Sequence, residues 1–167
     1  MVTPAVTSRE ELLAILQEVK DPEIPAVSIV ELGIVRDATV EDGRVCVRIT
    51  PTYSGCPAMF EIERDIVDAL ARHGMTDVAI ETVHSPAWTT DWIAEGAREK
   101  LRAGGIAPPG PVTGGGLVTL ERRRGPARCP YCGSADTQLR SEFGSTACKA
   151  IHFCAACSQP FDEFKAF

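Results

Sequence analysis

The chain has 167 residues, 44% of them hydrophobic, and a formal net charge of −6. That length suits one medium domain with a smaller one and excludes a large multidomain enzyme. The charge is uneven, because residues 1–117 carry 10 basic and 18 acidic side chains, whereas residues 118–167 carry 7 and 5. Binding to nucleic acid depends on neutralising phosphates, so the longer, acidic part is a poor candidate for it.

Neither export nor membrane insertion is indicated. No apolar stretch approaches the roughly 18 residues that span a bilayer. The first residues, MVTPAVTSREELLAIL, have acidic side chains where a signal peptide has a basic region. We therefore expect a cytoplasmic protein without a membrane partner. Its seven cysteines then need a role other than disulfide bonding, and five of them lie in the last 39 residues.

The first part of the chain predicts alternating helices and strands. Residues Thr7-Ser8-Arg9-Glu10 form a capping-box pattern ahead of a helix that ends at Asp21-Pro22. Asp42-Gly43 fits the two-residue turn of a β-hairpin. The helix is expected to bury Leu12, Ile15, Leu16 and Val19, and the second strand to bury Val45, Val47 and Ile49 but not Cys46 or Arg48.

A second helix is expected to start near Pro57, with Gly74 as its C-terminal cap. The segment DVAIETV then predicts a strand, and DWIAEGAREKLRAGG predicts a third helix. This order of elements predicts a small α/β sandwich, in which helices cover a mixed sheet of three or four strands. The buried stripe of the second helix is expected to comprise Met59, Ile62, Ile66, Val67 and Leu70.

A segment rich in glycine and proline divides the chain. Residues 103–116, AGGIAPPGPVTGGG, contain six glycines and three prolines, so we expect neither helix nor strand to run through them. Because cysteine density and charge change across the segment, we interpret it as a linker rather than a long loop packed on one domain. The expected domains are residues 1–104 and 121–167, joined by a linker over residues 105–120.

Two CxxC pairs, Cys129-Pro-Tyr-Cys132 and Cys154-Ala-Ala-Cys157, are separated by 21 residues. Four thiolates from two tight turns can surround one ion tetrahedrally, and the separation is close to that of zinc ribbons. A unit of this size also needs the folding free energy that a metal supplies. We therefore predict a structural zinc bound by Cys129, Cys132, Cys154 and Cys157 in a C-terminal zinc-ribbon-like domain.

Other interpretations of this C-terminal part stay open. Cys148 adds a fifth thiol, which keeps an iron–sulfur cluster as an alternative to zinc. His152 could replace one cysteine, although two intact pairs need no substitute. The run Arg122-Arg123-Arg124 would favour nucleic acid, but a short basic run beside a linker is more often simply solvated. A closed four-cysteine site has no open position for water, so we expect it to serve protein docking rather than catalysis.

Cys56 follows a glycine and precedes the proline that opens the second helix. Free backbone N–H groups and the helix dipole there predict a lowered thiol pKa, suited to a nucleophile or a soft-metal ligand. The alternative is a small apolar residue at a helix cap. Asp21 and Glu23 add two carboxylates on a rigid turn; they would raise the thiol pKa but would suit a transient iron site. The sequence has no Ser/His/Asp or HExxH pattern and no glycine-rich phosphate loop, so we predict no catalytic residues.

The segments DPEIPAVSIVELGIV and TPTYSGCPAM resemble the metal–sulfur cluster assembly domain of iron–sulfur maturation factors, over roughly residues 8–105. Three further segments extend the likeness to nearly the whole chain, and they are similar to the D components of phenylacetyl-CoA epoxidase, a branch of that family. These segments are PAWTTDWIAEGAREKLRAGGIAPP, CPYCGSADTQLRSEFGSTACKA and CAACSQPFDEFKAF.

The resemblance implies a non-catalytic accessory protein of aerobic phenylacetate degradation. It would mature an iron or iron–sulfur centre of the epoxidase, either in the di-iron oxygenase or in the reductase with its flavin and 2Fe–2S cluster. The resemblance also implies that Cys56 is the functional thiol, with Asp21 and Glu23 beside it as the site for a transient iron–sulfur cluster or iron. An iron–sulfur electron-transfer subunit of the same oxygenase is the alternative, and self-association stays open.

Overall fold

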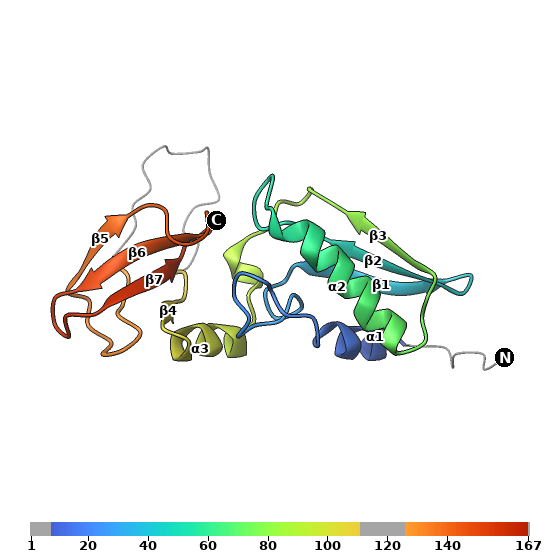
Figure 1. The fold of residues 1–167 in the computed structure, drawn as a ribbon, viewed down its shortest axis with the longest axis horizontal. Helices are drawn as coiled ribbons and strands as arrows, with labels where there is room; N and C mark the ends of the chain where they lie inside the picture. The colour runs from blue at the N-terminus through green and yellow to red at the C-terminus, as the bar shows by residue number, and fades with distance from the viewer. Residues whose placement is uncertain (1–7, 111–125, 167) are drawn as a thin grey trace. The chain divides into compact units, whose positions relative to one another are not determined.

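The structure, a computed structural model, describes residues 8–110 and 126–166. The chain forms two compact units, each with its own sheet (Figure 1). The first unit contains the residues up to Trp88 together with Trp92–Ala94, and the second contains Thr89–Asp91 and the residues from Glu95 onward. The limits that we expected for the two domains remain a prediction. Residues 111–120 of the expected linker and the run of three arginines lie outside the described residues.

Helix α1 (Arg9–Leu16) opens the first unit. The Ser8 Oγ accepts a hydrogen bond from the Glu11 backbone N–H at 3.2 Å, and the Glu11 carboxylate accepts one from the Ser8 N–H at 2.8 Å. The capping box therefore exists, one residue later than predicted, because Ser8 and Glu11 have the same spacing as the pair we expected. The helix also ends before the predicted Asp21, at Leu16, and Lys20 forms a β-bridge with Ser28.

The first unit has a mixed sheet of three strands, which confirms the predicted kind of sheet, and their order is β1-β2-β3. Strands β1 (Val35–Glu41) and β2 (Arg44–Ile49) are antiparallel, and β3 (Val78–Thr82) runs parallel to β2. The turn between β1 and β2 has φ values of 51° at Asp42 and 84° at Gly43, the left-handed pair that a tight hairpin requires. Alternate side chains of β2 are buried, which confirms the predicted inward face.

Helix α2 (Ala58–Arg72) lies across the sheet in Figure 1, and it packs against both α1 and β3. Gly74 follows the helix with a φ of 84°, which confirms the predicted cap. The expected burial of Val67 was wrong, because this side chain is 39% exposed. It lies on the side of the helix that faces away from the core. The buried side chains of α2 are Ala58, Ile62, Ile66, Ala69 and Leu70.

The core of the first unit lies between the helices and the inward face of the sheet. The segment after β3 closes this core, because the Trp88 indole N–H donates to the Leu32 carbonyl at 3.0 Å. The Arg36 guanidinium lies 3.5 Å from the centre of the Trp92 ring. The largest fully buried side chains of this unit are Leu12, Leu16, Val27, Ile29, Leu32, Ile34, Ile49, Ile62, Ile66 and Leu70.

The second unit starts with a short 3-10 helix, η1 (Thr90–Trp92), although Trp92 itself belongs to the first unit. Helix α3 (Glu95–Ala103) follows. The four-stranded sheet of this unit has the order β4-β7-β6-β5. The third helix therefore starts later than predicted. The sheet consists of β4 (Ile106–Ala107), β5 (Thr137–Ser141), β6 (Lys149–Cys154) and β7 (Pro160–Phe164). Strand β4 is a two-residue strand inside segment 103–116, through which we expected neither helix nor strand to run. It pairs with β7, and its Ala107 is buried in the small core of this sheet.

Candidate functional site

Two tight turns present the four cysteines of the second unit. Cys129 and Cys132 lie in the turn before β5, where the Gly133 N–H donates to the Cys129 carbonyl at 2.9 Å. Cys154 ends β6, and Cys157 lies in the turn that leads to β7. There the Cys154 N–H donates to the Gln159 carbonyl, also at 2.9 Å. Each turn thus fixes the backbone that carries one CxxC pair.

The four sulfur atoms form one cluster. All of them lie within 4.8 Å of one another, and the Cys129–Cys157 and Cys132–Cys154 sulfur pairs are each 3.6 Å apart. Zinc–sulfur bonds of about 2.3 Å in a tetrahedron place the sulfurs about 3.8 Å apart. The donor set therefore fits a tetrahedral metal. Within residues 8–110 and 126–166, no other group of three or more His, Cys, Asp or Glu side chains meets this distance criterion.

The thiols of this cluster ionise unequally. A hydrogen bond from the Cys157 backbone N–H lowers the pKa of Cys154 to about 7. Burial, together with the neighbouring thiols, raises the pKa of Cys157 to about 12. One thiolate therefore forms readily near neutral pH, whereas the last one needs a cation to stabilise it. A metal that binds to the cluster would displace the remaining thiol protons.

The cluster also forms part of the core of its sheet. Cys129 and Cys154 are buried against Ala107, Ala127 and Phe161, and Cys157 packs against this group. Phe161 is the one large side chain that the structure describes in this group, and Phe164 of β7 is also fully buried. A metal held by the four thiolates would join the two turns to each other and stabilise the fold.

Neither Cys148 nor His152 belongs to the cluster. The Cys148 sulfur lies 3.1 Å from the Thr146 hydroxyl, and the His152 Nε2 lies 2.8 Å from a carboxylate oxygen of Glu163. The His152 ring also stacks on Phe161, with ring centres 5.4 Å apart. The structure thus groups four thiols, not five, and gives the histidine another partner.

Cys56 lies one residue before Pro57, the N-cap of α2, and its side chain is partly buried. Burial raises the pKa of the Cys56 thiol, and the negative charge of Glu23 raises it further. Hydrogen bonds from the Ala58 backbone N–H and from the side chains of Tyr53 and Thr52 act in the opposite direction but do not reverse the shift. The predicted lowering was therefore wrong, because burial and a nearby carboxylate exceed the effect of the helix N-terminus.

The acidic turn is held by its own aspartate. The buried Asp21 carboxylate accepts hydrogen bonds from the backbone N–H groups of Glu23 at 2.9 Å and Ile24 at 2.8 Å. The charge of Glu23 acts on Cys56, which brings the turn and the thiol into one neighbourhood. However, Asp21, Glu23 and Cys56 are not a group whose ligand atoms all lie within 4.8 Å of one another. Asp21 organises the turn, and the charge of Glu23 acts on the thiol.

Sequence reasoning missed Thr52 and Tyr53 as partners of the thiol. Both side chains hydrogen-bond the Cys56 sulfur and lower its pKa. Their position three and four residues before the cysteine, between a strand and a helix, was the available signal. That signal does not by itself show that the loop places both side chains beside the sulfur of Cys56.

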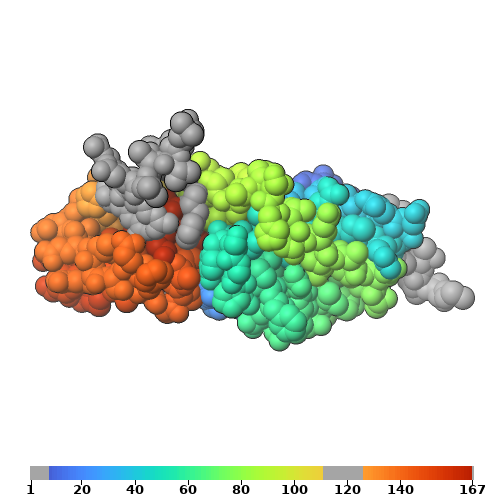
Figure 2. Space-filling model, turned by 90° about the horizontal axis from the view of Figure 1, so that it is seen from above, coloured from blue at the N-terminus to red at the C-terminus, as the bar shows by residue number. Residues whose placement is uncertain are grey.

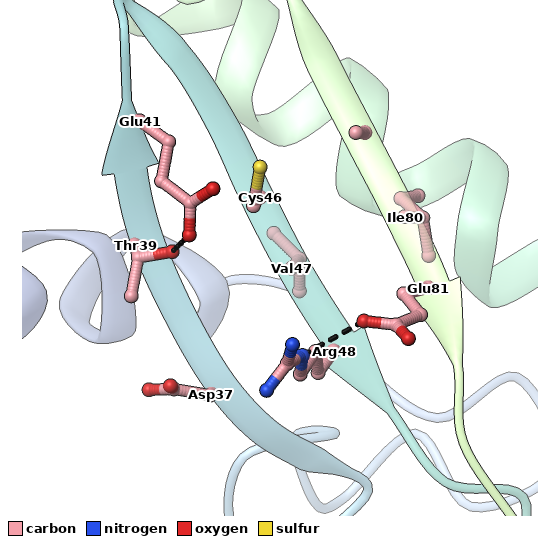
Figure 3. Close-up of a pocket in the computed structure, with 9 residues that line it drawn as sticks. Asp37, Thr39, Glu41, Cys46, Val47, Arg48, Ile80 and Glu81 are labelled. Carbon is pink, nitrogen blue, oxygen red and sulfur yellow. Dashed lines mark hydrogen bonds and ion pairs between the residues drawn. The ribbon is translucent and has the colours of Figure 1, made fainter.

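The other cysteine of the first unit, Cys46, lies on a different face. Figure 3 shows its side chain between those of β1 and β3, close to the Arg48–Glu81 ion pair, whose N–O distance is 2.8 Å. The side chains in this view line a pocket with a volume of about 220 Å³, and most of them are polar or charged. Because strand side chains alternate, Cys46 points away from the core and from the helices. The structure thus separates the two cysteines of this unit.

Two family models match the chain. The model described as an iron–sulfur cluster assembly protein matches residues 9–84, and the PaaD zinc beta ribbon domain matches residues 114–165.

No helix in the described part of the chain has the length and hydropathy needed to cross a bilayer.

Relatives with curated names agree with these matches. The putative D component of 1,2-phenylacetyl-CoA epoxidase from Escherichia coli K12 is 43% identical over 165 residues, which cover 99% of this chain and 97% of that protein. The Fe-S protein maturation auxiliary factor YitW of Bacillus subtilis is 35% identical over 95 residues, covering 56% of this chain and 92% of that protein.

Among solved structures, the DUF59 domain of unknown function from Bacillus anthracis has a TM-score of 0.52 and 29% identity. It covers 56% of this chain and 90% of that domain. The mixed sheet with its helices is thus the fold of that domain, and the four-cysteine sheet is a zinc ribbon. The chain belongs to the PaaD family, the D components of phenylacetyl-CoA epoxidase.

Proposed function

We propose that this protein is a non-catalytic accessory factor that matures an iron or iron–sulfur centre of 1,2-phenylacetyl-CoA epoxidase. The observation that carries the proposal is the environment of Cys56. A thiol at the start of α2 is close enough to Glu23 for the carboxylate to raise its pKa, and it has hydrogen bonds from Thr52, Tyr53 and the Ala58 N–H. The names of the relatives supply the context of iron–sulfur maturation and of the epoxidase.

Cys56 and Glu23 would hold the iron or the cluster as cargo. With its raised pKa the thiol is protonated at neutral pH, and a cation beside it would favour the thiolate. One sulfur and one carboxylate oxygen leave other positions of the iron free for ligands of the client protein. Asp21 would contribute by fixing the turn that presents Glu23, since its carboxylate accepts two backbone N–H groups. An incomplete ligand set of this kind suits transfer better than permanent binding.

The four cysteines of the second unit would hold a structural zinc. A site with four protein thiolates has no open position for water, so it stabilises the fold and does not activate a substrate. We expect this zinc ribbon to contact the oxygenase or the reductase of the epoxidase. We also propose the cytoplasm as the compartment, because free thiols persist in a reducing environment.

The test compares Cys56→Ser with Cys46→Ser, a matched control in the same unit with similar burial. Each variant is expressed together with the oxygenase and reductase, and iron and acid-labile sulfide are measured in the purified components. We expect Cys56→Ser to lower the iron of one component and Cys46→Ser to leave both unchanged. Full iron in both components with Cys56→Ser would refute the proposal.

The alternative of an electron-transfer subunit has a separate test. Its cluster would absorb visible light in the anaerobically purified protein, whereas zinc is colourless. A visible spectrum typical of a cluster, lost in Cys154→Ser, would replace our proposal with this alternative. We expect a colourless protein that contains one zinc.

A further inference from the structure

We propose that the outer face of α2 is the docking surface for the client protein, and that its occupant is a basic segment with an apolar side chain that packs on Phe60. This inference rests on the proposed function and names the partner surface of the same site. The apolar part consists of Phe60 and Val67, which we call the α2 ridge. The two residues are seven positions apart, so they lie on the same side of the helix.

The α2 ridge is exposed to an unusual degree for large apolar side chains. Phe60 is 79% exposed, the highest value among the large hydrophobic side chains that the structure describes, and Val67 is 39% exposed. Figure 2 shows α2, coloured teal to green, at the surface of the molecule. Aromatic side chains are enriched at the centres of protein interfaces, where one such residue often dominates the affinity.

The position of the ridge links it to the thiol. Phe60 comes four residues after Cys56, about one helical turn further along the chain. A protein that packs on Phe60 would therefore lie beside the sulfur. A cargo held by Cys56 and Glu23 must reach ligands of the client, and docking next to the thiol makes this direct.

The charge next to the ridge indicates the chemistry of the occupant. An open groove of about 410 Å³ runs between α2 and the segment after α1, and five acidic side chains line it against two basic ones. Three of the acids, Glu61, Asp65 and Asp68, come from α2. Arg72 is 3.6 Å from a carboxylate oxygen of Glu18. Arg64 of α2 is 3.4 Å from Glu61 and 3.1 Å from Asp65, so part of the charge of both signs is already paired. The groove keeps a net negative charge, which complements lysine and arginine side chains of a partner.

The groove also reaches the acidic turn that presents Glu23, because Asp21 and Pro22 line it. Glu61 and Asp68 line this groove and directly follow the ridge residues Phe60 and Val67 in the sequence, so the groove borders the flank of α2 next to the ridge. A second copy of this chain is a poorer match, because residues 1–117 carry a net charge of −8 and would repel themselves there.

The experiment measures binding of the full-length zinc-loaded chain to the purified oxygenase and to the purified reductase by biolayer interferometry. We expect one component to bind, and Phe60→Ala to weaken that binding at least tenfold, as truncation of a central aromatic anchor does. Phe143→Ala is the matched control, since this ring of the second unit is 68% exposed. We expect it to bind like the unchanged protein.

A second pair of variants tests the charge. Asp68→Lys should weaken binding at low salt, because it replaces an attractive charge with a repulsive one. It should also reduce the dependence of binding on salt, because less attraction is left for salt to screen. Glu99→Lys, on the exposed part of α3, is its control. Far-ultraviolet circular dichroism establishes that each variant is folded, and tryptophan fluorescence also reports on the first unit in Phe60→Ala and Asp68→Lys.

Three results would overturn the docking surface. The first is that Phe60→Ala binds both components as the original protein does. The second is that the original protein binds neither component. The third is that Phe60→Ala changes the oligomeric mass of this chain in light scattering. The proposed function fails separately, when Cys56→Ser leaves the iron of both components intact. A loss of iron with Cys56→Ser but full binding with Phe60→Ala would keep the function and reject this surface.

Discussion

Gly33 lies where the segment around Trp92 packs on the turn before β1, and its φ is 71°. A Cβ atom at this position would be 2.7 Å from the Trp92 Cβ and 2.9 Å from the Trp92 carbonyl oxygen. The tryptophan cannot easily move away. Its ring lies under Arg36, and the N–H of Ala94, two residues later, donates to the Glu31 carbonyl at 2.9 Å.

Two effects add up in Gly33→Ala. A side chain with left-handed backbone costs about 1–2 kcal/mol, and the overpacking costs about 1–3 kcal/mol, so we expect a loss of about 2–5 kcal/mol in the free energy of unfolding. Gly43→Ala is the control, because its φ is 84° and no heavy atom lies within 4 Å of the added Cβ. It should lose only the backbone contribution, about 1–2 kcal/mol.

Urea unfolding followed by tryptophan fluorescence measures both variants. The chain has two tryptophans, and both belong to the first unit, so the signal reports the stability of that unit alone. Gly33→Ala should unfold at a lower urea concentration than Gly43→Ala. Equal losses in the two variants would refute the reasoning, because the contact with Trp92 would then contribute nothing.

Three further predictions concern the cap, the metal and the thiol. Ser8→Ala should lower the stability of the first unit by about 1 kcal/mol in the same urea assay, and no change would mean that the capping box does not stabilise α1. Cys154→Ser should reduce the amount of bound zinc, measured by mass spectrometry of the native protein, and leave the tryptophan-detected unfolding midpoint in urea unchanged. Retention of one zinc per chain would argue against the four-thiolate site. Because the charge of Glu23 raises the pKa of Cys56, Glu23→Gln should lower that pKa and move the rise of alkylation rate with pH to lower pH. An unmoved pH profile of the Cys56 peptide would show that Glu23 does not act on the thiol.

Short-range features of this protein follow from its sequence. The hairpin turn at Asp42-Gly43 and the alternating burial of β2 need only neighbouring residues, and the structure confirms both. The grouping of the four thiols was predictable as well, because each CxxC spacing fixes two of them within one turn. The predicted capping box was one residue too early, because the pairs Thr7/Glu10 and Ser8/Glu11 both match the pattern.

Tertiary structure decided the features that depend on residues far apart in the sequence. The pKa of Cys56 rises instead of falling because burial and Glu23, 33 residues earlier, exceed the effect of the helix N-terminus. Strand β4 forms in a segment rich in glycine and proline because β7 offers it a partner more than 50 residues away. Val67 is exposed because no other element covers that side of α2 within the described part of the first unit. Local pattern fixes which conformation a segment prefers, but charge, burial and strand pairing depend on what the fold places beside it.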